Sequence, residues 1–176
     1  MKKIKRTEIL IAGGGIVGSL MALALAENGF DVVLVDPTFE TTLQTNRVNR
    51  SYAISRTSKR LLKNLKVWDR LDGKFEPITK IILSESNEKT MNVTRLAEFY
   101  LQDESEEPSS YMVEDLEIRS ALNLRLRASK NLEILTNCKV LSEEVKKGGS
   151  MILLDNDTKI FVSLFVICDG PKSSLA

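Results

Sequence analysis

Apolar runs and helical repeats alternate along this chain. Residues 9–12 are apolar throughout, and beyond a glycine turn the apolar side chains of residues 16–24 recur at helical spacing. Asn28 and Gly29 favour the end of that helix. A second apolar run, residues 32–35, then ends in Asp36. This pattern predicts a strand, a glycine turn, a helix and a second strand that presents a carboxylate at its end.

A second helix and strand are predicted further along the chain. Residues 115–129 have helical spacing, with Glu114 and Asp115 at the positive end of the helix dipole and a break at residues 130–131. Residues 132–135 then predict a short strand, which completes a second crossover onto a parallel sheet. The apolar positions of this helix are Leu116, Ala121, Leu122, Leu124 and Leu126.

The end of the chain has the pattern of an antiparallel meander. Residues 140–145 and 151–154 alternate with polar turns and lead into residues 161–168, which are almost continuously apolar. Such a strand is expected to be buried on both faces. It ends in Asp169, so an acid is expected at the carboxyl edge of the sheet, where doubly wound folds bind ligands.

The segment between the first unit and the second helix is less regular. Residues 37–49 form a polar loop without periodicity, and a loop of this length in a compact domain usually has a function. Ser55 or Thr57 is expected to cap the helix that follows. The inner side of that helix and of the residues after it is predicted to carry Leu61, Leu62, Leu65, Val67, Trp68 and Leu71.

Two strands and an acidic loop are predicted next. Residues 78–83 and 89–95 have strand character around a polar turn at residues 84–88. Residues 103–110 are expected to form an exposed acidic loop whose charges are solvated, and residues 111–113 resume strand character.

The glycine turn carries the clearest chemical prediction. Gly13 permits a tight turn out of the first strand, Gly15 lets a pyrophosphate approach the backbone, and Gly18 lets the helix lie close to the sheet. Amide groups at the helix start would face the phosphates. Asp36 follows Gly18 by 18 residues, where a second strand presents a carboxylate to a ribose hydroxyl. An acid here rather than an arginine predicts a dinucleotide of the FAD or NAD type, and not NADP.

Four arginines surround the approach to the helix near residue 60: Arg47, Arg50, Arg56 and Arg60. The planar guanidinium group pairs well with phosphate. Arg50, which emerges from the long loop beside the dinucleotide site, is therefore predicted to be a phosphate clamp. A solvated surface arginine is the alternative.

Composition narrows the classes of function. The 25 Lys and Arg against 24 Asp and Glu give no support for nucleic-acid binding. The absence of histidine excludes Ser-His-Asp and Cys-His catalysis and histidine-ligated metal, so the chemistry is expected to come from a bound cofactor. Cys138 and Cys168 lie far apart and form neither a redox pair nor a metal cluster, and they are expected to be reduced core thiols of a cytosolic protein. The basic start of the chain is followed by too short an apolar run for a signal peptide or a spanning helix.

Four segments in this order resemble the FAD-dependent aromatic monooxygenases, and most closely the ubiquinone-biosynthesis hydroxylases. Residues 13–18 with Asp36 are similar to the family's FAD-binding fingerprint, and residues 50–71 to its arginine-containing segment ending in Gly-Val-Trp. Residues 112–126 are similar to its Val-Glu-Asn helix, and residues 165–176 to its Asp-Gly motif. The departures are Asp36 where glutamate is more usual, Lys66 for the glycine, Asp115 for the asparagine, and the lack of the arginine that normally ends the last motif.

The resemblance implies a cofactor and a set of contacts. Arg119 occupies the position from which a glutamine or arginine reaches the flavin, and Asp169 that of the aspartate at the ribityl and pyrophosphate region. In such enzymes NAD(P)H reduces FAD, oxygen adds to the flavin, and the hydroperoxide hydroxylates a phenolic ring. No catalytic side chain is named, because the flavin performs the oxygen chemistry. The implied FAD contacts are Gly13, Gly15, Gly18, Asp36, Arg50, Arg119 and Asp169.

The expected fold class is α/β: a Rossmann-like FAD-binding domain of the glutathione-reductase type, with a parallel sheet, an antiparallel meander and part of a small substrate lobe. Residues 1–176 are expected to form this domain, and residues 75–112 a partial insertion of the substrate lobe. Family members continue beyond the Asp-Gly motif into a substrate sheet and a second Gly-Asp motif. The sequence therefore looks like the N-terminal half of such a hydroxylase.

Three hypotheses about function stay open at this point. The chain is the FAD-binding part of a monooxygenase that hydroxylates a polyprenyl-phenol or quinol ring in ubiquinone biosynthesis. Alternatively it is a module that holds a dinucleotide, FAD or NAD, and needs a partner chain for activity. The third hypothesis is an inactive truncated remnant with exposed apolar surface.

Each hypothesis carries expectations about partners and location. The expected partners are an aromatic polyprenyl substrate, a polypeptide carrying the C-terminal half, or other ubiquinone-biosynthesis proteins, and neither nucleic acid nor a transmembrane segment is expected. The expected location is the cytoplasm, with peripheral membrane contact left open.

Overall fold

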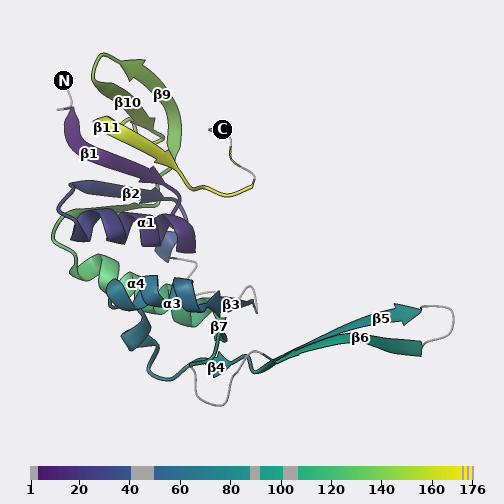
Figure 1. Cartoon of the computed structure of the whole chain (residues 1–176). Helices are drawn as coiled ribbons and strands as arrows, with labels where there is room; N and C mark the ends of the chain where they lie inside the picture. The colour runs from purple at the N-terminus through teal and green to yellow at the C-terminus, as the bar shows by residue number, and fades with distance from the viewer. Residues whose placement is uncertain are drawn as a thin grey trace.

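The chain is built around one six-stranded sheet with the order β8-β2-β1-β11-β10-β9 (Figure 1). The structure, a computed structural model, describes residues 4–40, 50–87, 92–100 and 107–171, with residues 173 and 175. Strands β8, β2, β1 and β11 run parallel, and β10 and β9 continue the sheet antiparallel. This confirms the predicted α/β class with a parallel sheet and a meander. The strands are β1 (Lys5–Ala12), β2 (Val32–Asp36), β8 (Leu132–Thr136), β9 (Val140–Lys146), β10 (Gly149–Leu154) and β11 (Lys159–Ile167).

Alternate residues of the central strands face two separate cores. On β1, Ile9 and Ile11 belong to the core shared with helices α1 (Ile16–Glu27) and α4 (Asp115–Ala128). Leu10 and Ala12 belong to the core shared with the meander. Because successive side chains of a strand point to opposite faces, a strand covered on both sides must be apolar without interruption. This explains the unbroken apolar runs in β1 and β2.

The prediction for the last strand is right only for its first half. Ile160 and Val162 of β11 are fully buried, but Leu164 is 50% exposed and Ile167 is 38% exposed. The reason is that β10 pairs with β11 only from Lys159 to Val162, so the meander does not cover the rest of the strand.

Helix α4 confirms the predicted helix and its acidic start. Glu114 is the N-cap residue, and Ser129 is the C-cap residue. Ala121, Leu122 and Leu126 are buried as predicted, whereas Leu124 is 55% exposed. Leu124 lies two residues from both buried leucines, about 200° around the helix from each, so it points away from the core.

A small antiparallel sheet and a short helix lie beside this framework. The sheet has the order β3-β7-β4, formed by β3 (Ser51–Ser55), β7 (Ser110–Glu114) and β4 (Glu76–Pro77). Helix α3 (Arg56–Asn64) follows β3 directly, and Ser55, not Thr57, caps it by accepting a hydrogen bond from the Ser58 amide at 3.2 Å. Leu61 is 46% exposed, which contradicts its predicted burial. The other predicted inner residues of this segment are buried: Leu62, Leu65, Val67, Trp68 and Leu71, the last two in the 3-10 helix η1 (Trp68–Leu71).

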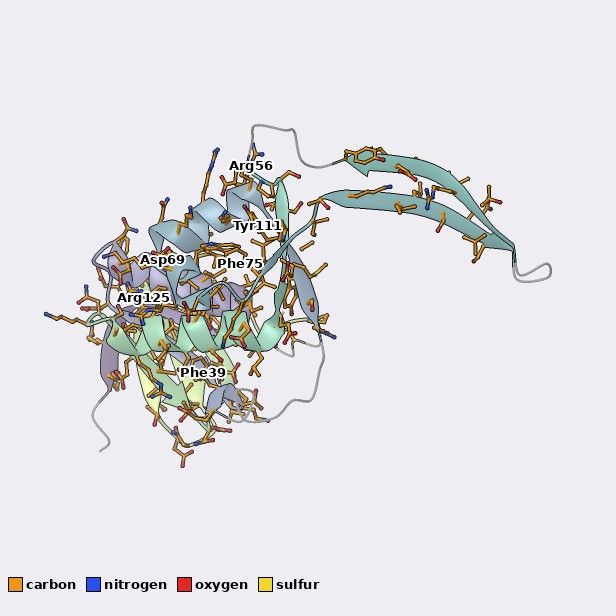
Figure 2. The ribbon with its side chains drawn as sticks, turned by 90° about the horizontal axis from the view of Figure 1, so that it is seen from below. Phe39, Arg56, Asp69, Phe75, Tyr111 and Arg125 are labelled. Atoms are coloured by element: carbon orange, nitrogen blue, oxygen red, sulfur yellow. The ribbon has the colours of Figure 1, made fainter. Side chains whose placement is uncertain are left out.

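Three aromatic rings and one lysine form a cluster between α3 and β7. The ring of Trp68 lies 4.7 Å from that of Phe75 and 5.3 Å from that of Tyr111, measured between centroids. Figure 2 shows Phe75 and Tyr111 together beside α3. Lys59 is 7% exposed and forms an ion pair with Glu107. Glu107 is exposed, as predicted for the acidic loop, but its carboxylate also pairs with a buried lysine. Residues 103–106 of that loop lie outside the described residues.

A long two-stranded hairpin extends away from the rest of the chain (Figure 1). It consists of β5 (Lys80–Asn87) and β6 (Asn92–Tyr100). The predicted turn at residues 84–88 is wrong, because residues 84–87 continue β5 and pair with residues 92–95. The polar residues 84–87 can belong to a strand because a ribbon that faces solvent requires no apolar side chains there. Residues 88–91 lie outside the described part of the chain.

Other expectations concern segments with no described structure. Residues 41–49 of the predicted polar loop, with Arg47, lie outside the described residues. None of the helices that are described is both long enough and apolar enough to span a bilayer. The assignment of residues 75–112 to a substrate lobe stays a prediction.

Candidate functional site

The glycine turn connects β1 to α1 with very little space around it. Gly13 has a φ of +105°, and a Cβ atom there would lie 2.4 Å from the carbonyl oxygen of Cys168. A Cβ atom on Gly18 would lie 1.9 Å from the carbonyl oxygen of Gly13. A side chain at either position would therefore collide with backbone, and the absence of side chains lets α1 begin directly against the carboxyl end of the sheet.

Gly15 is different, because a Cβ atom there would meet no heavy atom within 4 Å. Its backbone, with φ −62° and ψ 178°, is extended and open to any residue type. Neither packing nor backbone conformation in this chain requires a glycine at this position. The missing side chain instead leaves the backbone open to a ligand.

The amino end of α1 has amide groups without a side-chain cap. Gly15 is the N-cap residue and offers no side-chain acceptor, and the first turn contains no acidic residue. The first amide donor inside the helix is that of Ser19, which bonds to the Gly15 carbonyl at 2.9 Å. Free amides and the positive end of the helix dipole suit an anionic group.

Asp36 is held in one orientation at the end of β2. Its Oδ2 accepts a hydrogen bond from the Gly14 amide at 2.6 Å, and its Oδ1 accepts one from the Thr38 amide at 2.7 Å. The hydroxyl of Thr38 also donates to Oδ1, at 3.0 Å. A carboxylate has room for about four hydrogen bonds, so Oδ2 can still accept one from a ribose hydroxyl.

An apolar cleft of about 390 Å³ opens beside the glycine turn. Its walls come from α1, β3, α3, α4 and the residue after β11. Its polar groups are few, and the largest is the guanidinium of Arg119. The lining residues are Gly15, Ile16, Val17, Leu20, Tyr52, Ile54, Ser58, Leu61, Leu62, Ile118, Arg119 and Cys168. A mostly apolar cleft with a few polar groups is the usual form of a cofactor site.

Arg119 is held at the wall of this cleft by Asp115, which Tyr52 in turn supports. Its Nε donates to Oδ2 of Asp115 at 2.7 Å, one helical turn earlier on α4. The hydroxyl of Tyr52 donates to Oδ1 of the same carboxylate at 2.9 Å. The side chain of Arg119 is 23% exposed.

Most of the predicted site residues come together at the carboxyl end of the parallel strands. The three glycines, Asp36 and Arg119 surround the turn and its cleft. Asp169 is exposed two residues after the end of β11, with its amide nitrogen 2.7 Å from where a Cβ atom of Gly13 would lie.

Arg50 lies apart from the other predicted site residues. Its side chain is exposed, and Arg50 is not among the residues that line the cleft. Its carbonyl accepts a hydrogen bond from the Asp115 amide at 2.8 Å. The backbone of Arg50 thus adjoins the start of α4, and its role as a phosphate clamp stays a prediction.

The cleft includes residues that sequence reasoning missed. Tyr52, Ile54 and Ser58 line it, and β3, which carries the first two, was not predicted. The alternation of Tyr52 and Ile54 with small residues is the period of a half-buried strand and could have revealed it.

The two cysteines have different surroundings. Cys138 is a buried core thiol, as predicted, whereas Cys168 is half-buried and lines the cleft. Burial raises the pKa of both thiols, and the nearby carboxylates of Asp155 and Asp169 add to the rise at Cys138 and Cys168 respectively. Raised pKa values describe unreactive thiols.

Comparison with known proteins now identifies the family. Residues 6–176 match the model of a family described as FAD binding domain. The chain belongs to this FAD-binding domain family. It is 31% identical over 172 residues to ubiquinone hydroxylase UbiL of Rhodospirillum rubrum, covering 97% of this chain and 39% of that protein. It is 32% identical over 160 residues to 3-demethoxyubiquinol 3-hydroxylase of Escherichia coli, covering 83% of this chain and 39% of that protein.

Solved structures agree on the fold of this FAD-binding domain. A crystal structure of a P. aeruginosa PqsL variant superposes with a TM-score of 0.78 at 15% identity, covering 97% of this chain and 44% of that one. The predicted Rossmann-like FAD-binding fold and the resemblance to ubiquinone-biosynthesis hydroxylases are both confirmed. The chain spans about 39% of the length of the curated relatives named here.

Proposed function

We propose that this chain binds FAD across the glycine turn, as the FAD-binding part of a flavin monooxygenase. The observation that carries the proposal is the open, uncapped amino end of α1 at Gly15. A diphosphate placed there would accept hydrogen bonds from the free amides of the first helical turn. In this proposal Gly13 and Gly18 shape the turn, and Gly15 leaves room for the pyrophosphate.

Four charged residues would hold the rest of the cofactor. Asp36 would accept a hydrogen bond from a ribose hydroxyl, since its Oδ2 retains capacity beyond the bond from Gly14. The guanidinium of Arg119 would donate to polar atoms of the cofactor in the cleft. Asp169 would lie at the pyrophosphate and ribityl region, and Arg50 would clamp a phosphate from the loop before β3.

The bound flavin would supply the redox chemistry, taking electrons from NAD(P)H and activating oxygen. The chain itself would orient the flavin and exclude water, which the apolar residues of the cleft favour. We propose a polyprenyl-phenol or quinol ring as the substrate, because two relatives are named as hydroxylases of ubiquinone or demethoxyubiquinol. No side chain of the described residues is assigned a catalytic role.

A second candidate is a dinucleotide-binding module that a partner polypeptide completes. The observation in its favour is the apolar surface of the β5–β6 hairpin, where Ile81 is 47% exposed, Leu83 52% and Phe99 53%. Apolar groups of this size gathered on a projecting ribbon usually lie against another surface. This candidate predicts that activity appears only when a polypeptide carrying the remaining half is added.

Titration with FAD tests the proposed function. FAD should bind and lose fluorescence, while riboflavin, which lacks the diphosphate and adenosine, should bind at least about tenfold more weakly. NADP should not compete, because the Asp36 carboxylate would repel a 2′-phosphate. Equal affinity for FAD and riboflavin would contradict a site built on the glycine turn.

A further inference from the structure

Asp115 bridges two residues of the cleft but does not line the cleft itself. Its Oδ1 accepts the hydrogen bond from Tyr52 at 2.9 Å, and its Oδ2 accepts the one from Arg119 at 2.7 Å. The carboxylate side chain is 15% exposed. One acid thus uses both oxygens to hold two side chains that come from different elements.

The fold places these three residues together. Pairing of β3 with β7 sets Tyr52 opposite Val113, two residues before α4 begins. The Asp115 amide donates to the Arg50 carbonyl at 2.8 Å, which fixes the start of α4 against the residue before β3. Arg119 follows one turn later on the same side of α4.

We propose that Asp115 is a positioning residue that holds Arg119 in the orientation needed to bind FAD. This inference rests on the proposed function. Because Asp115 engages Nε, the two terminal nitrogens of the guanidinium remain for the cofactor. A long side chain that is fixed before the ligand arrives loses less conformational entropy when the ligand binds. Tyr52 supports the carboxylate from the other side.

The competing explanation treats Asp115 only as a negative charge near the site. FAD is anionic, so a carboxylate with no positioning role would weaken its binding, and removing the charge would strengthen it. Asp115→Asn separates the two explanations. The amide keeps the size of the carboxyl group but loses its charge, so the ion pair with Arg119 becomes a weaker hydrogen bond to a neutral oxygen, and one of the two acceptor atoms is replaced by a donor.

The test is a double-mutant cycle, in which the FAD dissociation constant is measured for the wild type, Asp115→Asn, Arg119→Gln and the double variant. We expect Arg119→Gln to weaken FAD binding about tenfold and Asp115→Asn about threefold to tenfold. The double variant should bind no more weakly than Arg119→Gln, because Asp115 acts through Arg119. Glu117→Gln is the matched control, since it removes an acid from the same first turn whose carboxylate contacts Lys74 instead.

A second measurement needs no FAD. In the nuclear magnetic resonance spectrum of the free protein, the Nε proton of Arg119 should exchange with water equally slowly in the wild type and in Glu117→Gln, and faster in Asp115→Asn. An Nε proton that exchanges as slowly in Asp115→Asn as in the wild type would overturn the proposal. Unchanged or tighter FAD binding by Asp115→Asn would also overturn it, as would a double variant as weak as the product of the two single effects. Failure of the wild type to bind FAD would instead contradict the proposed function itself.

Discussion

The Lys59 ammonium lies 2.8 Å from the phenolic oxygen of Tyr111 and 4.0 Å from the centre of its ring. The same ammonium pairs with Glu107 and lies 5.0 Å from the ring of Trp68. Glu107 lies three residues before the start of β7, and Lys59 belongs to α3. One buried cation therefore ties β7 and the residues that lead into it to the helix that lines the cleft.

Replacing Lys59 by methionine should loosen this connection. The variant keeps an unbranched apolar side chain but loses the charge-assisted hydrogen bonds, and we expect a loss of about 1–2 kcal/mol in the free energy of unfolding. Trp68 is the only tryptophan, so its fluorescence reports on this cluster alone. Urea titration followed by Trp68 emission measures the effect. Arg60→Met on the exposed side of α3 is the control, and it should shift the midpoint of urea unfolding little.

The same ion pair predicts a pH dependence at the acid end. The hydrogen bond from Lys59 lowers the pKa of Glu107. A carboxyl group with a lowered pKa in the folded state contributes stability that is present above the unfolded pKa and is lost as the pH falls through the folded pKa. The wild type should therefore be more stable than Glu107→Gln at neutral pH, and the difference should vanish in acid below the ordinary range of glutamate. Melting temperatures of both proteins from neutral to acid pH would show this convergence, and a constant difference would refute the ion pair as its cause.

At alkaline pH the stability from this ion pair should be lost as the pH rises, because the group that titrates there is Lys59. Burial lowers the pKa of Lys59, but the hydrogen bonds with Glu107 and Tyr111 outweigh this effect and raise the pKa above 10.5. The stability from Lys59 is therefore complete below the unfolded pKa and is lost only as the pH rises through the folded value. Between the unfolded pKa values of glutamate and lysine, the stability that this ion pair contributes should not change with pH.

Gly18 should be intolerant of even one methyl group. Alanine favours helices by about 1 kcal/mol over glycine, but a Cβ atom here would lie 1.9 Å from the Gly13 carbonyl oxygen. The steric overlap should outweigh the gain in helix propensity, so we expect Gly18→Ala to lower the free energy of unfolding by about 1–3 kcal/mol. Chemical denaturation without any ligand measures this loss. A stable Gly18→Ala protein would mean that α1 does not lie as close to the turn as described.

The sequence predicted the first βαβ unit well because its local signals agree. Apolar runs, the spacing of the glycines and the acid at residue 36 all require the same arrangement, and the structure has it. Helix α4 and β8 were predictable for the same reason, since a strong helical period ends next to a short apolar run.

The remaining differences come from contacts between distant segments. The exposure of Leu164 depends on how far β10 extends along β11, which no local pattern encodes. Tyr52 and Asp115 are 63 residues apart along the chain, and their contact depends on the pairing of β3 with β7. The burial of Lys59 was hidden because a charged residue is normally assigned to the surface, although it lies three residues before the buried Leu62.

Gly15→Ala provides the most direct test of the central claim that a diphosphate lies against the backbone at the start of α1. Its φ of −62° suits alanine and the space around it is open, so the melting temperature without ligand should be unchanged or slightly higher. FAD should nevertheless bind roughly tenfold more weakly, because the new methyl group occupies the position of the phosphates. The measurement is the FAD dissociation constant of Gly15→Ala beside that of the wild type. A stable variant with weakened FAD binding is the predicted result, and a stable variant that binds FAD as tightly as the wild type would contradict the account.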